Sequence, residues 1–288
     1  MNSKAFSPGH ISGFFDPVFY PNDFSRSGSR GAGVSITLGA LSKVSILDSH
    51  NQNIEVFING RRSPAPVTKL ALKYLIGKNK LNIVVRTNLD LPMGQGFGMS
   101  GAGALSSCLA ATKLCGLSDV DALKAAHFAE VNLKTGLGDV VSSFLGGFEI
   151  RKTPGLPPWG FTEHIPGKHD IVVCVIGPKI NTKKILEDRK FISPIIEYGQ
   201  FCTKKILENP SVENLFYLSN IFTKKTGLAT KDILKAIDAC EKHGNISMCM
   251  LGNSVFSVGK TDELSKILSN FGKVYICTVD ETGARILK

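Results

Sequence analysis

The sequence predicts an α+β fold built from two halves. Segments typical of strands and of helices occur along all 288 residues, without the strict β-α-β order of a doubly wound parallel sheet. A proline-rich stretch at residues 153–159 interrupts this pattern, and a chain of this length can hold two compact domains. We therefore predict one domain over residues 1–155 and a second over residues 156–288.

The first half opens with a stretch rich in glycine and aromatic residues, at 4–39, whose end runs into an alternating strand. Alternating or β-branched residues predict strands, and apolar residues at helical spacing predict helices. On these grounds we expect strands at residues 34–38, 44–47, 54–58, 81–87 and 148–151. Helices are expected at residues 64–78, 104–114 and 120–132, and a helix-like segment at 140–145.

The second half begins beyond the proline-rich stretch and, like the first, is predicted to mix strands and helices. Strands are expected at residues 171–176 and 274–279. Helical segments are expected around residues 185–208, 212–225, 231–243 and 262–271. A glycine-flanked hydrophobic segment, residues 248–258, lies between the last two helices.

The composition describes a globular protein that can bury a core, with 43% hydrophobic and 20% charged residues. The net charge of +10, from 34 basic and 24 acidic residues, could suggest nucleic acid, but the lysines are scattered. No basic and aromatic residues interleave in the manner of an RNA-binding strand. A basic surface suits small anionic substrates equally well. We expect a small-molecule substrate and no nucleic acid.

Cysteine usage and hydropathy point to a reducing compartment. The seven cysteines are widely spaced and form no C-x-x-C pair, which argues against a disulfide framework or a zinc site. The longest apolar run, residues 171–176, is far too short to cross a bilayer. Pro8, Gly9 and His10 stand where a signal peptide would need an apolar core. We expect a cytoplasmic protein with no membrane partner.

The most informative stretch is residues 92–104, which read PMGQGFGMSGAGA between an expected strand and an expected helix. Glycines let a backbone approach an anion closely, and the free N–H groups at a helix N-terminus bind its charge. The arrangement therefore predicts a polyphosphate-binding loop; a turn required only for packing is the alternative. The five glycines are Gly94, Gly96, Gly98, Gly101 and Gly103.

Two familiar nucleotide motifs do not account for this stretch. No Gly-Lys-Ser/Thr follows the glycines, so there is no Walker A sequence. Residues 96–101 match G-x-G-x-x-G, but the dinucleotide fingerprint also requires an acidic residue at the end of a second strand. Asp119 and Asp121 lie at about the right distance and begin a helix instead. An oxidoreductase is therefore disfavoured.

Three residues near this stretch have side chains suited to phosphoryl transfer. Asp139 follows a glycine-bearing turn and could accept a proton from a substrate hydroxyl, or could simply cap the next helix. Glu130 lies on a helix rich in alanine and could bind magnesium, or could be solvated. Ser100 could offer its hydroxyl to the same ion, since Mg²⁺ prefers few, hard oxygen ligands.

Two basic side chains lie near the N-terminus. His10 could be a buried structural histidine. Arg30, with Ser29 beside it, stands among small residues that offer little to pack on. A guanidinium in that setting suits a bidentate grip on a carboxylate or a phosphate.

Together these motifs resemble those of the GHMP kinase superfamily, in the same order and at similar separation. They are residues 7–10 (SPGH), 92–102 (PMGQGFGMSGA) and 136–139 (GLGD), the last followed by Gly146 and Gly147. The central motif of the family usually reads P-x-x-x-G-L-G-S-S-A-A, so Phe97, Met99 and Gly101 are departures. The strings at 5–15 and 28–34 resemble, more specifically, the archaeal pantoate kinases. The third motif of the family corresponds to residues 250–256, here with the single glycine Gly252.

The resemblance implies a two-domain α+β GHMP kinase fold, with a ribosomal-protein-like N-terminal domain and a ferredoxin-like C-terminal domain. It implies that ATP lies between them and that Ser100 and Glu130 hold Mg²⁺. Asp139 would orient or deprotonate the attacking hydroxyl. The residues expected around the nucleotide are Pro92, Gly94, Gly96, Phe97, Gly98, Met99, Ser100, Gly101 and Ala102.

The implied activity is phosphorylation of pantoate to 4-phosphopantoate on the archaeal route to coenzyme A. We assign the substrate carboxylate to Arg30, with Ser29 nearby, and expect His10 and Asp139 among the substrate-binding residues. His10 takes no charged role from the lysine or arginine of relatives. A homodimer is expected by analogy with the family. Another GHMP kinase, acting on homoserine, shikimate or a mevalonate-type alcohol, and a non-catalytic nucleotide-binding relative are the alternatives.

Overall fold

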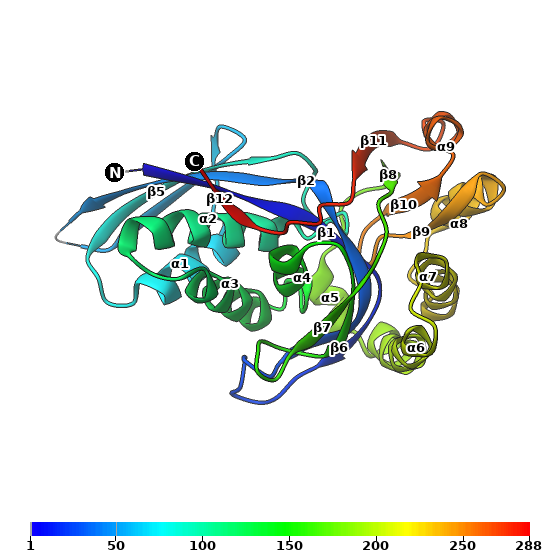
Figure 1. The fold of residues 1–288 in the computed structure, drawn as a ribbon, viewed down its shortest axis with the longest axis horizontal. Coiled ribbons are helices and arrows are strands. Elements are labelled where there is room, and N and C mark those ends of the chain that lie inside the picture. Colours follow the sequence, from blue (N-terminus) through cyan, green and yellow to red (C-terminus); the bar gives the residue numbers. More distant parts are fainter. Residues whose placement is uncertain (1, 50) are drawn as a thin grey trace.

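Two β-sheets organise the chain, and helices cover both (Figure 1). The computed structural model describes residues 2–49 and 51–288. Over those residues the first sheet has the strand order β12-β1-β2-β5-β3-β4, with β6 paired to β2 and β7 paired to β6. Its strands are β1 (Asn2–Val18), β2 (Gly28–Asp48), β3 (Asn53–Ile58), β4 (Arg61–Arg62), β5 (Leu81–Leu89), β6 (Phe148–Thr153), β7 (Phe161–Ile165) and β12 (Arg285–Leu287).

A long antiparallel hairpin of β1 and β2 forms the middle of the first sheet. One end of β2 pairs with β6, and its other end pairs with β5. The register of β1 against β2 shifts between Pro8 and Gly9 and again between Ser12 and Phe14. Because such irregularities bend a strand and increase its twist, the hairpin is strongly curved, with β6 and β7 beside its lower part (Figure 1). This curvature brings the middle of β1 close to elements of both halves.

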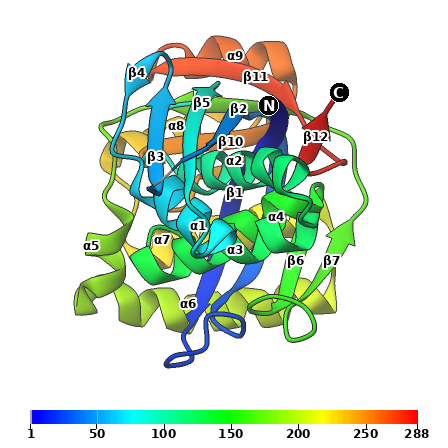
Figure 2. The ribbon, with the colours of Figure 1, turned by 90° about the vertical axis from the view of Figure 1, so that its left-hand side faces the viewer.

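Four helices cover one face of the first sheet (Figure 2). They are α1 (Pro66–Ile76), α2 (Met99–Cys115), α3 (Asp119–Leu133) and α4 (Asp139–Leu145). Helix α2 contacts β1 and β2 on one side and α1 and α3 on the other. Its residues 101–112 are buried, which explains why they are mainly glycine, alanine, serine and leucine. Its position fixes the loop that precedes it.

The second sheet is antiparallel and has the strand order β11-β8-β10-β9. Its strands are β8 (Asp170–Val175), β9 (Gly244–Met248), β10 (Ser254–Gly259) and β11 (Lys273–Thr278). Its helices are α5 (Thr182–Glu187), α6 (Arg189–Glu208), α7 (Val212–Thr226), α8 (Lys231–Cys240) and α9 (Thr261–Leu268). This chain order is that of a ferredoxin-like β-α-β-β-α-β unit in which α5 to α8 fill the first helical position. It is consistent with the fold expected for the second half.

The chain changes sheet between β7 and β8 rather than at the proline-rich stretch. Strand β7 pairs with β6 in the first sheet, and β12, near the end of the chain, pairs with β1. The first sheet therefore includes segments on both sides of residue 155, and the predicted domain boundary stays a prediction.

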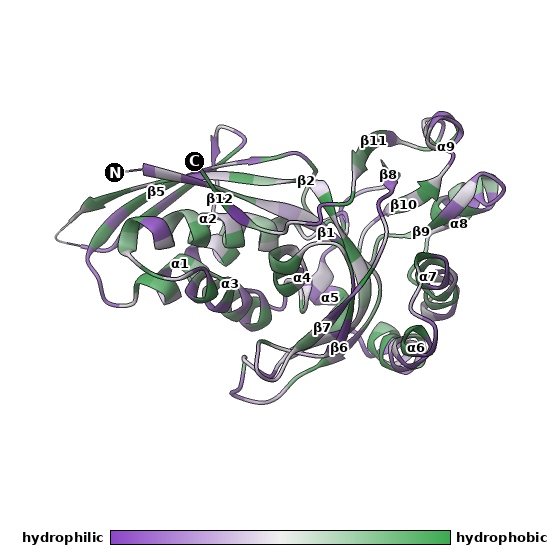
Figure 3. Ribbon diagram, viewed as in Figure 1, coloured by the Kyte–Doolittle hydropathy of each residue, from purple (hydrophilic) through white to green (hydrophobic). Residues whose placement is uncertain are grey.

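Hydrophobic packing joins the two sheets. One cluster of buried residues extends from Ile11 and Phe14 of β1 to Val173 of β8 and Phe256 of β10. A second cluster lies between the first sheet and helices α1 to α3. In Figure 3 the helices carry both hydrophobic and hydrophilic stretches, as expected for helices that cover a sheet with one face. No helix of the described chain is long and apolar enough to span a bilayer.

Several elements differ from the sequence-based expectation, among them β1, α2 and the helix expected at residues 185–208. Strand β1 was not predicted, because its glycines and prolines disfavour strands; Gly13, for example, lies where an added Cβ would be 2.1 Å from the Ser219 hydroxyl oxygen. Helix α2 begins at Met99, five residues before the expected start at 104, because burial outweighs the low helix propensity of glycine. The expected helix at 185–208 is divided at Asp188 into α5 and α6.

Candidate active site

A cavity of about 390 Å³ lies where the loop before α2 meets both sheets. We call residues 92–98 of this loop the glycine loop. The cavity is lined by Ser12, Phe15 and Ser29 of β1 and β2; residues 93–94 and 96–101; residues 135–139; residues 179–183 and Leu186; and Met250 and Leu251. Of the residues expected around the nucleotide, Pro92 and Ala102 do not line this cavity and the other seven do.

Three glycines determine the path of the glycine loop. Gly94, Gly96 and Gly98 have φ angles of +76°, +75° and +62°, in the left-handed region that glycine adopts without strain. The loop leads directly into α2 at Met99, and the first N–H groups of a helix have no partner within it. These donors and the positive end of a long helix can bind an anion at the cavity wall.

The turn between β9 and β10 supports the glycine loop from the second sheet. Gly252 lies so close that an added Cβ would be 2.1 Å from the backbone carbon of Gln95. The Ser254 hydroxyl donates a hydrogen bond of 2.5 Å to the Gln95 carbonyl oxygen. The single glycine of the third motif therefore permits a close backbone contact, while Met250 and Leu251 line the cavity.

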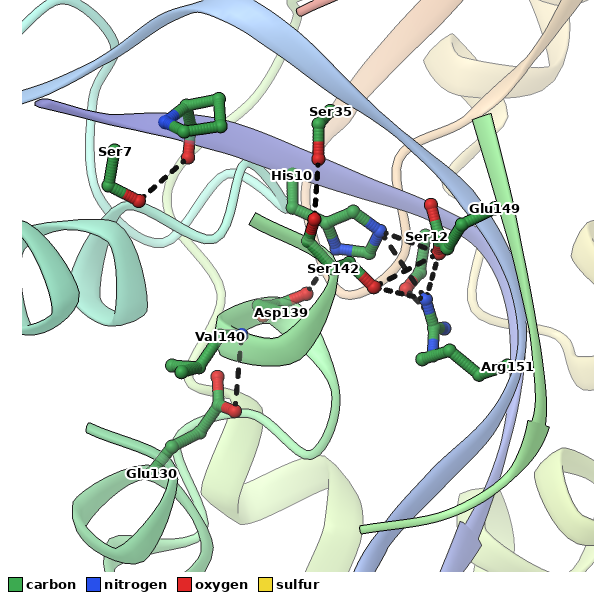
Figure 4. A network of polar contacts seen from close by, with 11 residues as sticks. Ser7, His10, Ser12, Ser35, Glu130, Asp139, Val140, Ser142, Glu149 and Arg151 are labelled. Carbon is green, nitrogen blue, oxygen red and sulfur yellow. Dashed lines mark hydrogen bonds and ion pairs between the residues drawn. The ribbon is translucent and has the colours of Figure 1, made fainter. Parts of the chain in front are cut away.

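Asp139 is held by a buried histidine (Figure 4). It is the first residue of α4, and its Oδ1 lies 2.8 Å from Nδ1 of His10. The other ring nitrogen, Nε2, lies 3.0 Å from Oε1 of Glu149 on β6. His10 itself is placed by its backbone N–H, which donates to the Phe97 carbonyl at 3.1 Å. The Asp139 side chain therefore does not act as a helix cap; it links the start of α4 to β1.

Arg151 completes this network of charges. Its guanidinium forms an ion pair with Glu149, and it donates to the hydroxyls of Ser142 at 3.0 Å and Ser12 at 3.1 Å. Arg151 is only 2% exposed, and its Nε has no hydrogen-bond partner among the described residues. A second cavity, of about 10 Å³, shares Ser29 and Gly138 with the first and is lined by Arg151. The guanidinium thus lies directly behind the main cavity.

The network keeps His10 positively charged. Burial by itself lowers the pKa of His10, but the negative charge of Glu149 and hydrogen bonds to Asp139 and Glu149 outweigh it and raise that pKa to about 9. Both ring nitrogens face carboxylates, as expected for an imidazolium that donates twice. Since His10⁺ and Arg151⁺ match Asp139⁻ and Glu149⁻, the group is neutral overall.

Glu130 is buried, contrary to the alternative of a solvated side chain. It is 2% exposed, and the hydrogen bond that it accepts, from the Val140 N–H, is long at 3.5 Å. Burial first, and then the charge of Asp139, raises the pKa of Glu130 well above its ordinary value. The carboxylate also lies close to Gly101 and Gly136, as the short distances from an added Cβ at either glycine show.

A cation beside Glu130 would offset the cost of burying this carboxylate. No group of three or more His, Cys, Asp or Glu residues in the described chain could hold a metal ion alone. Mg²⁺ at a nucleotide site, however, needs only one or two carboxylates, with water and phosphate as its other ligands. Glu130 and Ser100 fit such an ion.

The structure separates the residues expected to bind the substrate. Ser29 lines the cavity, whereas His10 is fully buried behind Asp139. Arg30 does not line the cavity, and its guanidinium forms an ion pair with Asp16, with its Nε 2.8 Å from the carboxylate. The reason is register: Arg30 and Asp16 are directly opposite each other on β2 and β1. In this structure Arg30 is therefore not available to the substrate acid.

Several residues that line or support the cavity were not singled out from the sequence. Lys179 and Lys183 line it from the segment after β8, and Arg151 and Glu149 form the charged network on β6. The strand at 148–151 was expected, but burial of two opposite charges on it was not. The Thr-Lys-Lys triplet at residues 182–184 contains Lys183, but the same triplet recurs at residues 203–205 and 223–225 and so does not single out this site.

Comparison with known proteins agrees with the geometry. Residues 66–147 match the family described as GHMP kinases N terminal domain. The chain is 33% identical to the pantoate kinase of Methanocaldococcus jannaschii, covering 95% of this chain and 99% of that one. It is 35% identical to the pantoate kinase of Methanospirillum hungatei, covering 98% and 96%.

One solved structure is similar to this chain over nearly the whole length of both chains. It is described as a phosphotransferase related to the CoA biosynthesis pathway, and its chain is 30% identical with a TM-score of 0.89, covering 99% of this chain and 98% of that one. The glycine loop, Asp139 and Glu130 lie close together in the present structure. The chain therefore belongs to the GHMP kinase superfamily, in the group that includes these pantoate kinases.

Proposed function

We propose that the protein is an ATP-dependent kinase that phosphorylates the terminal hydroxyl of pantoate to give 4-phosphopantoate in coenzyme A biosynthesis. The observation that carries the chemistry is the position of Asp139, which lines the cavity beside the glycine loop. A Cβ added at Gly98 would lie 3.2 Å from the Asp139 Cβ. The Asp139 side chain is therefore close enough to contact the glycine loop. The substrate assignment rests on the two relatives, which match nearly the whole chain.

In this proposal the glycine loop and the start of α2 bind the phosphates of ATP through backbone N–H groups. Asp139 orients the pantoate hydroxyl and accepts its proton as the hydroxyl oxygen bonds to the γ-phosphorus. The bond from that phosphorus to the β–γ bridging oxygen breaks, and ADP leaves. His10 occupies Oδ1 of Asp139, which leaves Oδ2 for the substrate.

Asp139→Asn tests this role. We expect kcat to fall at least about 100-fold, as for the loss of a general base, while the Kd for ATP changes little. Steady-state kinetics and titration calorimetry measure the two quantities. Full activity in this variant would exclude Asp139 as the proton acceptor.

We propose that Glu130 and Ser100 hold Mg²⁺, which when bound would neutralise charge on the phosphates. Glu130 carries this proposal because it is a buried carboxylate with little hydrogen bonding. Glu130→Gln should weaken Mg²⁺ binding to the ADP complex in titration calorimetry and should make the protein without ligand more stable. Unchanged Mg²⁺ affinity would contradict the assignment.

For the substrate carboxylate we propose Arg151 together with Ser29, in place of Arg30. The unpartnered Nε of Arg151 and the Ser29 hydroxyl both lie close to Gly138, within 2.8 Å of an added Cβ there. Arg151→Lys keeps the charge and removes the Nε–H. It should raise the KM for pantoate far more than the KM for ATP, whereas Arg30→Lys should change neither.

Turnover against a panel of alcohols tests the function as a whole. ADP release from ATP and Mg²⁺ should occur with pantoate and not with pantothenate, homoserine, shikimate or mevalonate. Turnover confined to another alcohol would discard the substrate assignment and keep the kinase chemistry.

We also propose that the protein is cytoplasmic and forms a homodimer. Light scattering should then give twice the 31.0 kDa mass of one chain.

A further inference from the structure

Two lysines line the cavity and have no anionic partner among the described residues. Lys179 and Lys183 are, with Asp139, the charged residues of its lining. Neither lysine takes part in an ion pair with any residue of 2–49 or 51–288. A cavity that carries unpaired cations at its wall favours an anionic ligand.

The other positive groups near the cavity are already neutralised. His10 faces Asp139 and Glu149, and Arg151 is paired with Glu149. This buried group therefore adds no net positive charge for a ligand as anionic as a triphosphate. The start of α2 supplies only partial positive charge, equivalent to about half an elementary charge. The two lysines are thus the uncompensated full charges in the cavity lining.

The lysines are held next to the glycine loop by backbone contacts. The Ile180 N–H donates to the Gly94 carbonyl at 2.8 Å, and the Gln95 side-chain amide donates to the Gly177 carbonyl at 2.9 Å. The Asn253 amide holds the Pro178 carbonyl at 2.7 Å. An added Cβ at Gly94 would lie 3.0 Å from the Cβ of Lys179. The segment after β8 is therefore fastened to the loop that we assign to the phosphates.

We propose that Lys179 and Lys183 bind the β- and γ-phosphates of ATP, so that the second sheet supplies the positive charge that the glycine loop lacks. The inference rests on the proposed kinase function. The lysine ammonium is a point charge on a flexible four-carbon chain, so it can adjust its position to a phosphate. Both lysine side chains are exposed enough to reach into the mouth of the cavity. This assignment leaves Ser29 and Arg151, near Gly138, to bind the carboxylate of the substrate.

Binding of nucleotides to Lys179→Ala and Lys183→Ala tests the proposal. Lys184→Ala is the matched control, because Lys184 is the exposed neighbour on α5 that does not line the cavity. Titration calorimetry with ATP, ADP and AMP is done without pantoate. Each test variant should bind ATP and ADP on the order of 10-fold more weakly, as for the loss of one charge-assisted hydrogen bond. Its affinity for AMP, and all affinities of the control, should stay within about 2-fold of the wild type.

The outcomes separate this inference from the proposed function. Unchanged ATP affinity in both test variants overturns the inference, and an accompanying rise in the KM for pantoate would assign the lysines to the acid instead. Equal weakening of AMP and ATP also overturns it, because the lysines would then contact the nucleoside end. Since binding is measured without pantoate, a wrong substrate assignment leaves the test intact. A wild-type protein that binds no ATP would overturn both proposals.

Discussion

The two oxygens of the Asp139 carboxylate have different roles at the scale of single residues. Oδ1 accepts from His10, and His10 is held in turn by Glu149, so the carboxylate cannot rotate without breaking a buried ion pair. Hydrogen bonds to charged groups are stronger than neutral ones, and a site residue held this way is ordered before substrate arrives. His10 and Glu149 therefore position Asp139 rather than contact the substrate themselves.

The charge of His10 should make folding stability depend on pH. Its pKa is about 9 in the folded protein and about 6.5 when unfolded, so protonation stabilises the native state. This contribution is complete below pH 6.5, declines as the pH rises and is lost above pH 9. Urea unfolding at pH 6.5 and pH 9.5 should show a loss on the order of 2–3 kcal/mol.

His10→Gln is the control for this prediction. The variant should be less stable than the wild type at pH 6.5, and its stability should vary less over the same interval. A wild-type protein whose stability is the same at both pH values would show that His10 is not protonated in the native state.

At the scale of elements, the glycine loop depends on two conditions, a left-handed backbone and an absent side chain. Gly98 meets both, since its φ is +62° and an added Cβ would lie 3.2 Å from Asp139. Gly116, which ends α2, has a similar φ of +66° but open space around it. Comparing substitutions at these two glycines therefore separates the effect of backbone strain from the effect of crowding in the site.

Gly116→Ala should therefore destabilise the protein by about 1 kcal/mol, because alanine is strained at positive φ, and Gly98→Ala should do so by at least as much. Only Gly98→Ala should also lower kcat, since its methyl group displaces Asp139. Thermal unfolding and steady-state kinetics measure the two effects. A fall in kcat of equal size in Gly116→Ala would mean that the effect on activity comes from stability alone.

At the scale of the whole molecule, the cavity has walls from both sheets, and one buried hydrophobic cluster joins them. Elements that share a core unfold together. We expect calorimetry to show one thermal transition, and ATP at about 100 times its Kd to add about 2.7 kcal/mol of stability. Two separate transitions, of which ATP shifts only one, would contradict a shared core and a nucleotide site between the sheets.

Local features of this chain could be read from its sequence. The glycine loop, the helix after it and the strand before it depend on residues close together in the chain, where backbone preference and periodicity apply. Ser100, Glu130 and Asp139 were selected because their side chains suit phosphoryl transfer. The roles that the family resemblance gives them stay proposals.

Only the tertiary structure decided which charges face the cavity. Arg30 is opposite Asp16 because of the β1–β2 register. Lys183 reaches the cavity because the segment after β8 binds the glycine loop, 82 to 86 residues away in the chain. Burial of Glu130 and Arg151 depends on helices and strands that pack over them. Charge pairing and burial are set by neighbours distant in sequence, whereas turns, strands and helices are set mainly by near ones.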